Sequence, residues 1–159
     1  MAKTIVVLLS GLLFLLIVGP VQLPAENPGV NLTPVGYWKT IDDKTSEVKS
    51  IVKIWLAQDG TLKGRIEKIF PKPGEDPNPV CDKCKGDKKD QPVLGMEFLW
   101  GFKGSGSEWG SGQVLDPENG KVYNCQLEVI DNGQKLKVFG YIRLIFKIGR
   151  SQIWLRVEG

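Results

Sequence analysis

The residues best suited to chemistry in this chain are three cysteines, two of which form a Cys-x-x-Cys motif. Cys81 and Cys84 lie in a stretch rich in proline and charge, and Cys125 lies in a later strand-like run. A thioredoxin-like redox pair needs a strand-to-helix setting that this stretch lacks, and a zinc site needs a fourth ligand. A structural disulfide is the remaining chemistry, and it is typical of exported proteins.

The sequence leaves the pairing of these cysteines open. A Cys81–Cys84 bridge would leave Cys125 as a buried thiol, whereas a bridge to Cys125 would staple the loop to the sheet. We favour the local pair, because Cys125 is flanked by polar Asn124 and Gln126 in a strand whose alternate face is expected to be core.

Catalytic arrangements are scarce, because the chain contains no histidine. Ser-His-Asp triads, Cys-His nucleophile pairs and His-ligated zinc are therefore excluded. Two carboxylate clusters remain, Asp42-Asp43 and Asp116 with Glu118. Both lie in predicted turns, where Asp stabilises the backbone, and neither has the ligand spacing of a calcium loop. We expect no catalytic residue, no metal site and no cofactor, which leaves a carboxylate-dependent enzyme as the weakest alternative.

Aromatic and polar side chains supply the candidate ligand-binding residues. Pockets for small molecules are lined mostly by apolar groups, with a few polar groups that orient the ligand. Trp100 and Trp109 flank the turn Gly104–Ser107, near one mouth of the barrel predicted below, although they can equally well close that end. The candidate set is Trp55, Trp100, Trp109, Arg150 and Gln152.

The composition favours a β-rich domain. The chain has 159 residues with 19 Gly and 10 Pro, and its only alanine past Ala25 is Ala57. Because alanine is the best helix former, a helical domain is disfavoured. The formal net charge is only +3, from 21 Lys and Arg against 18 Asp and Glu, which does not favour nucleic acid as a partner.

Residues 1–25 have the layout of a secretory signal peptide. Lys3 is a positive start, Ile5–Val18 is an apolar run too short to span a bilayer, and Ala25 is a small residue at a cleavage point. The alternative is an uncleaved anchor. We expect a periplasmic or secreted protein with no stable membrane span after cleavage, in which residues 26–34 form a flexible lead-in and residues 35–159 form one domain.

Runs of β-branched and aromatic residues, separated by turn sequences, predict the fold. Asp59-Gly60, Asp116–Gly120 and Asp131–Gly133 combine residues that preset or tolerate turn conformations. We expect an all-β antiparallel meander of about eight strands, with a long loop at 71–92, folded as a sandwich or closed into a small barrel; closure is favoured because it removes exposed sheet edges. The expected strands are Val35–Ile41, Val48–Gln58, Thr61–Phe70, Val93–Lys103, Gly110–Leu115, Lys121–Ile130, Gln134–Tyr141 and a final run to Val157.

The first and last strands carry residues able to seal such a barrel. These strands are neighbours in a closed meander, so an indole such as Trp38 can lie beneath a guanidinium such as Arg156 in a cation–π contact. The Gly-x-Trp start at Gly36 and the late Trp154-Leu155-Arg156 resemble the signature of lipocalin-type (calycin) barrels. The alternative is that Trp38 is an ordinary residue of the hydrophobic core. The resemblance implies a structural role for these residues and identifies no ligand.

A wider resemblance extends from Val35 to Val157. The chain contains, in this order, GYWKTIDDKTSEVKSIVKIW, CDKCKG, PVLGMEFLWGF, GSGQVLDPENGKVY, LKVFGYI and GRSQIWLRV. In these motifs it is similar to the bacterial domain-of-unknown-function family 2147 (DUF2147). The resemblance implies export and a lipocalin-like β-barrel, and no established activity. After Gly140-Tyr141-Ile142 the family usually has another glycine and small residues, where this chain has Arg143, Phe146 and Lys147.

These observations predict a binding protein. The first hypothesis is that a small apolar or amphipathic ligand is carried inside the barrel, in the cell envelope; an interior filled by side chains would contradict it. The alternative is a periplasmic protein-interaction module that meets an envelope partner through the 71–92 loop or through the apolar strand Ile51–Leu56.

Overall fold

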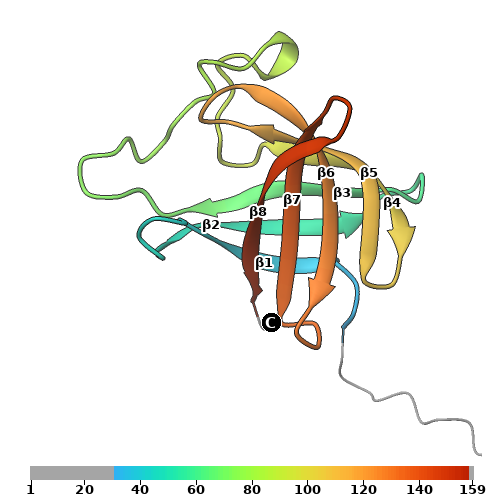
Figure 1. Ribbon diagram of the computed structural model, residues 1–159. Helices are drawn as coiled ribbons and strands as arrows, with labels where there is room; N and C mark the ends of the chain where they lie inside the picture. Colours follow the sequence, from blue (N-terminus) through green and yellow to red (C-terminus); the bar gives the residue numbers. More distant parts are fainter. Residues whose placement is uncertain (1–30, 158–159) are drawn as a thin grey trace, which may run out of the picture.

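Eight antiparallel strands form a closed barrel in the computed structural model, which describes residues 31–157 (Figure 1). Each strand pairs with the next along the chain, and β1 closes the barrel against β8. The predicted fold class is therefore confirmed. The strands are β1 (Gly36–Ile41), β2 (Val48–Leu56), β3 (Leu62–Ile69), β4 (Glu97–Ser105), β5 (Glu108–Asp116), β6 (Lys121–Ile130), β7 (Lys135–Arg143) and β8 (Lys147–Arg156).

The N-terminal predictions fall mostly on residues outside this range. The predicted signal peptide, residues 1–25, lies outside the described residues, as does the first part of the predicted lead-in. Residues 31–34, which end that lead-in, lie against the barrel, and Pro34 is fully buried. Among residues 31–157 there is no helix that is long and apolar enough to cross a membrane.

The hairpin turns follow the turn chemistry of the sequence. Gly60, in the β2–β3 turn, has a φ of +77°, and Asp131–Gly133, in the β6–β7 turn, all have positive φ. These are conformations that Gly, Asn and Asp adopt at the lowest steric cost. The β4–β5 turn is shorter than expected, because Gly104 and Ser105 still pair with Trp109 and Glu108 in the sheet.

The two ends of the barrel differ. We call the end with the β2–β3, β4–β5 and β6–β7 turns the closed end, because residues 31–35 also cross it on their way into β1. The opposite end, with the β1–β2, β5–β6 and β7–β8 turns and the long segment between β3 and β4, is the open end (Figure 1).

Large side chains fill the barrel interior. Phe102 of β4 lies against β5 so closely that a Cβ atom added to Gly112 would be 2.4 Å from its ring. No polar or charged residue is buried among those that the structure describes. The packing of large apolar side chains in the interior disfavours a ligand carried deep inside the barrel. The largest fully buried side chains are Trp38, Phe102, Ile54, Leu62, Leu99, Leu127, Leu136 and Val52.

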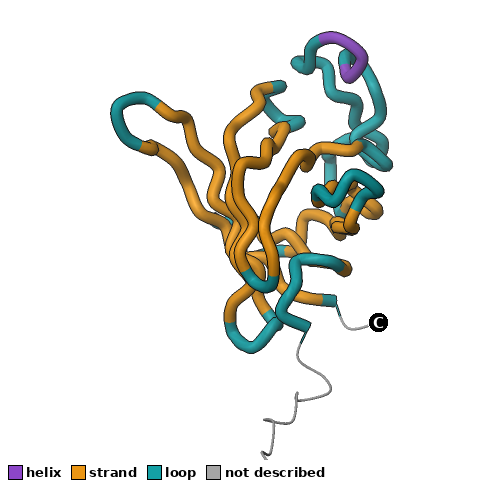
Figure 2. Tube along the Cα trace, turned by 90° about the vertical axis from the view of Figure 1, so that its right-hand side faces the viewer, coloured by secondary structure: helices purple, strands orange, loops and turns teal. Residues whose placement is uncertain are grey.

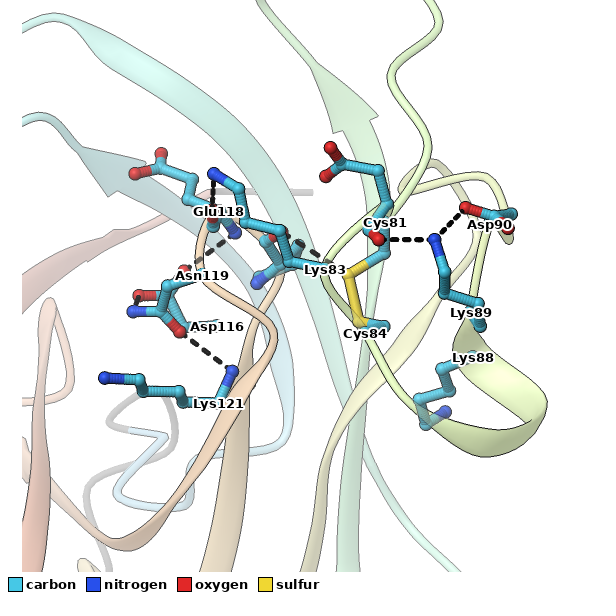
Figure 3. The surroundings of a disulfide bond; sticks show 12 residues. Cys81, Lys83, Cys84, Lys88, Lys89, Asp90, Asp116, Glu118, Asn119 and Lys121 are labelled. Atoms are coloured by element: carbon cyan, nitrogen blue, oxygen red, sulfur yellow. Dashed lines mark hydrogen bonds and ion pairs between the residues drawn. A yellow bond between two sulfur atoms is a disulfide. The ribbon is translucent and has the colours of Figure 1, made fainter.

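The segment between β3 and β4 is the predicted long loop, and it is pinned to the barrel. Cys81 and Cys84 form a disulfide and are both buried, so the favoured local pairing is confirmed. Lys83, between them, donates from Nζ to the carbonyl of Glu118 at 3.0 Å, in the β5–β6 turn (Figure 3). The segment contains a single 3₁₀ turn, η1 (Gly86–Lys88). The loop thus lies on the β5–β6 turn at the open end.

Cys125 is the remaining cysteine, and it is buried in the wall of the barrel. It pairs with Gly112 of β5 and Gly140 of β7. Burial raises the pKa of its thiol to about 12, so the reactive thiolate is strongly disfavoured at neutral pH.

The filled interior predicts the response to a single added methyl group. Gly112→Ala should lower the free energy of unfolding by about 1–3 kcal/mol, because the methyl group overlaps the Phe102 ring. Gly110→Ala is the matched control on the same strand, since its Cβ would meet nothing closer than Gln126 Nε2 at 3.6 Å. Urea unfolding of both variants measures the difference; equal stability for the two would contradict a packed interior.

The cysteine arrangement predicts a thiol count. The oxidised, folded protein should show no thiol that reacts with Ellman's reagent at neutral pH, because Cys125 is buried and protonated. In denaturant one thiol per chain should react, and three should react after reduction. A thiol that reacts readily in the folded, oxidised protein would contradict this arrangement.

Candidate ligand-binding site at the open end of the barrel

The closed end is sealed by Arg156 and Trp38. The guanidinium of Arg156 lies over the Trp38 ring, with 4.1 Å between its Cζ atom and the ring centroid. Its N–H groups also donate to the carbonyls of Thr33 at 2.8 Å and of Val35 at 3.1 Å. The Trp38 indole donates to the carbonyl of Pro34 at 2.8 Å. The last strand thus holds the segment that enters the first.

Gly36 makes room for this seal. Its φ is +133°, and an added Cβ atom would be 3.0 Å from Nη1 of Arg156. Desolvation by burial lowers the pKa of Arg156. A guanidinium with several carbonyl partners and an aromatic face beneath it is fully occupied by the protein. The closed end is accordingly a structural site, in which the protein itself engages the Arg156 guanidinium.

Trp154 belongs to the interior and lies one layer nearer the open end. It pairs with Leu136 of β7 and is buried, and its ring centroid is 6.2 Å from that of Phe98. Its indole N–H donates to Oε1 of Gln152 at 3.3 Å. Trp154, which the sequence grouped with the seal, thus lies in the core beneath Gln152, between the seal and the open end.

A short series of polar contacts leads from Trp154 to the surface of the open end. Nε2 of Gln152 donates to Oδ2 of Asp43 at 3.3 Å, and Arg150 forms an ion pair with the same carboxylate. Asp43 lies in the β1–β2 turn, whereas Arg150 and Gln152 lie on β8. Alternation along β8 places Arg150, Gln152 and Trp154 on one face of the strand, which is the face that Trp154 turns to the core.

Apolar side chains continue the same face toward the open end. Ile142 of β7 pairs with Ile148 of β8, two positions beyond the Gly140–Arg150 pair, and the two isoleucine side chains are about half exposed. Gly140 leaves space between them and the core, because an added Cβ atom would meet only Val114, at 3.7 Å. The open end therefore combines an exposed guanidinium with apolar surface on a single strand pair.

The three predicted tryptophans do not join Arg150 and Gln152. Trp55 pairs with Lys63 on the outer wall and lies under Arg65, 5.9 Å from ring centroid to Cζ. Trp100 bonds Gln113 through its indole N–H at 2.9 Å, and Lys88 of the loop lies over its ring. Trp109 packs on the core beside the β4–β5 turn, at the closed end, and donates to the carbonyl of Gly106 at 3.1 Å. The structure thus brings together two of the five predicted residues.

Two hollows lie on the outer surface of the described part of the chain. One, of about 290 Å³, lies between η1 and the start of β4, and another, of about 450 Å³, lies beside Trp55 at the end of β2. Both are wide open to solvent, and neither is lined by Arg150, Gln152 or Trp154.

The carboxylate clusters form turns, as their sequence context suggests. Oδ1 of Asp42 accepts the backbone N–H groups of Lys44 and Thr45, at 2.9 and 3.0 Å, and these bonds lower its pKa to about 2. Oδ1 of Asp116 accepts the N–H of Glu118 at 2.9 Å in the β5–β6 turn. Both clusters therefore stabilise backbone turns.

Sequence reasoning missed two features of this end. Asp43 was assigned only to a turn, and its contact with Arg150 joins residues far apart in the chain. The apolar run between Arg143 and Lys147 was noted only as a departure from a family pattern. Its signal was visible, because a hairpin turn without Gly, Asn, Asp or Pro is unusual and Leu144–Phe146 contains none.

Comparison with known proteins places the chain in a family. No curated protein matches it closely enough to count as a relative. Among solved structures it is similar to protein HP1028 from the human pathogen Helicobacter pylori, described as belonging to the lipocalin family. The TM-score is 0.65 at 17% identity, over 81% of this chain and 84% of that one, so this likeness concerns the fold. Residues 36–156 match the family of uncharacterized proteins conserved in bacteria, DUF2147, and the chain belongs to that family.

Proposed function

We propose that this chain is a non-enzymatic binding protein of the bacterial cell envelope that holds a small amphipathic anion at the open end of its barrel. The observation that carries the proposal is the exposed Arg150 guanidinium on the same face as Ile142 and Ile148. A guanidinium binds carboxylate or phosphate groups, and an apolar surface beside it binds a hydrocarbon chain.

The open end is favoured over the interior as the place for the ligand. Large side chains fill the interior down to the Trp38–Arg156 seal, whereas Gly140 leaves space above the core. Arg150 has one partner among the described residues, Asp43, so most of its five N–H donors remain available. Gln152 is positioned to add a polar contact.

A location in the envelope agrees with two features of the chain. Residues 1–25 have the layout of a signal peptide, and a Cys81–Cys84 disulfide persists in oxidising compartments. The family is conserved in bacteria, so the compartment we propose is the periplasm or the exterior.

The alternative of a protein-interaction module is supported by one observation. The hollow between η1 and β4 is lined by both loop and strand residues, and the disulfide holds the loop in place around it. A partner that binds there would contact Lys88 and Leu94 and would leave Arg150 free.

Calorimetric titration with decanoate, a ten-carbon carboxylate, tests the proposal below its micelle concentration. Arg150→Gln should weaken decanoate binding about tenfold, because one charge-assisted hydrogen bond is lost. Arg65→Gln is the matched control, since Arg65 is also exposed and paired with a carboxylate, Glu67, on the outer wall. Ile142→Ser should weaken binding by removing apolar contact.

Decyltrimethylammonium provides the opposite charge on the same chain length, and it should bind more weakly than decanoate. Equal affinity of the wild-type protein and Arg150→Gln for decanoate would overturn the proposal. So would equal affinity for the two amphiphiles, because Arg150 would then make no contribution to selectivity.

A further inference from the structure

The β7–β8 hairpin carries an unusual concentration of exposed apolar side chains. We call Leu144, Ile145 and Phe146 the apolar tip; their side chains are 66%, 99% and 67% exposed. Ile142 and Ile148 extend it on the two strands. The other exposed large apolar residues in the described part of the chain are spread over many elements, as is normal for a protein surface.

The tip projects from the molecule. Figure 2 shows the hairpin standing away from the remaining strands. The N–H of Leu144 donates to the carbonyl of Phe146 at 3.2 Å, which makes the turn tight. The three side chains therefore radiate from a narrow, convex end, with no wall of the same molecule beside them.

Positive charge lies directly behind the tip. Arg143 and Lys147 face each other in the register of β7 and β8, immediately below the three apolar residues. Arg150 follows on β8, and the chain has no Asp or Glu between Asp131 and Glu158. Lys147 is held in place by Gln126, whose Oε1 accepts from its Nζ at 3.1 Å. The hairpin thus has an apolar end and a cationic collar.

This arrangement matches the profile of an anionic bilayer surface. Apolar side chains of a peripheral protein enter the boundary between headgroups and acyl chains, and Lys or Arg behind them meets the lipid phosphates. A convex tip enters a fluid layer without needing a complementary cavity. A protein partner would have to supply a deep apolar pocket, and the two outer-surface hollows that a second copy of this chain would offer are wide open, with mixed polar lining.

We propose that the apolar tip Leu144–Phe146 inserts into the surface of a membrane that contains anionic lipids, with Arg143 and Lys147 against the phosphates. This inference does not require the ligand proposed above, because it rests on Leu144–Phe146, Arg143 and Lys147, although Ile142, Ile148 and Arg150 lie beside both features. It goes beyond that function by placing the open end of the barrel toward the bilayer.

Co-sedimentation with vesicles tests the inference. One set of vesicles contains phosphatidylglycerol and phosphatidylethanolamine, and the other contains phosphatidylcholine alone. The wild-type protein should sediment with the anionic set and much less with the neutral set. Ile145→Ser with Phe146→Ser should weaken binding by at least about tenfold, through the lost apolar insertion. Leu56→Ser with Leu155→Ser, two exposed residues at the closed end, should bind as the wild type does.

The collar has its own matched pair of variants. Arg143→Gln with Lys147→Gln should weaken binding to anionic vesicles about twentyfold and abolish the preference for them. Lys135→Gln with Lys137→Gln removes the same charge from the closed-end part of β7, where Asp131 and Glu128 already pair with these lysines. That variant should bind anionic vesicles nearly as the wild type does.

The outcomes separate this inference from its competitors. Failure of the wild-type protein to bind anionic vesicles would overturn the inference. Equal vesicle binding by the tip variant and the wild type would overturn it as well. Sedimentation velocity without lipid would reveal the competing occupant: a dimer that dissociates in the tip variant, together with no vesicle binding, would assign the tip to a second copy. Decanoate titration of the tip variant distinguishes the two proposals. Because Arg150 is unchanged in this variant, it should still bind decanoate even if it no longer binds vesicles.

Discussion

The closure of the barrel depends on a seam that the backbone only partly completes. The register of β1 and β8 covers Trp38–Arg156 and Lys39–Leu155, with one further backbone bond from the N–H of Val157 to the carbonyl of Tyr37, whereas β7 and β8 pair along nearly their whole length. Side-chain contacts between β1 and β8 add to the few backbone hydrogen bonds between them. Arg156 lies on the Trp38 ring and bonds carbonyls of the entering segment, so that the closed end is held by a charged group that is itself well satisfied.

The short pairing of β1 and β8 also explains why polar side chains gather at the open end. β8 is ten residues long and β1 only six, so the part of β8 toward the open end runs on without a β1 partner. Asp43, just after β1, spans the gap to Arg150 and Gln152 by side-chain contacts. An unpaired strand edge is a liability in a β protein, and polar and charged groups along it discourage edge-to-edge pairing. The residues that cross the seam are also the ones we propose to meet a ligand.

Much of the fold could be predicted from the sequence, because its signals are local. Turn residues such as Gly60 and Asp131–Gly133 have the positive φ that their types favour, and they separate the eight strands. The Trp38–Arg156 contact could also be predicted, because a closed meander must bring the first and last strands together. The Cys81–Cys84 bridge lies within one short loop, so it required no knowledge of register.

The candidate site was harder to predict from the sequence, because its position depends on strand register and on β-bulges. Positive φ at Gly101 accompanies a change in strand parity, so Leu99 and Phe102 both lie in the core while Trp100 contacts the loop. Tryptophan type alone could not show this. The Asp43–Arg150 pair joins turns and strands from opposite ends of the chain, and only the closed barrel brings them together.

The central claim is that contacts with a ligand are made at the open end and leave the packed interior unchanged. The most direct measurement is a backbone amide NMR titration of the protein with decanoate. Shifts are expected at Asp43 and along Ile142–Gln152, with the amide signals of Phe102, Leu127 and Leu136 unchanged. Shifts concentrated on those interior residues, with none at Arg150, would contradict it.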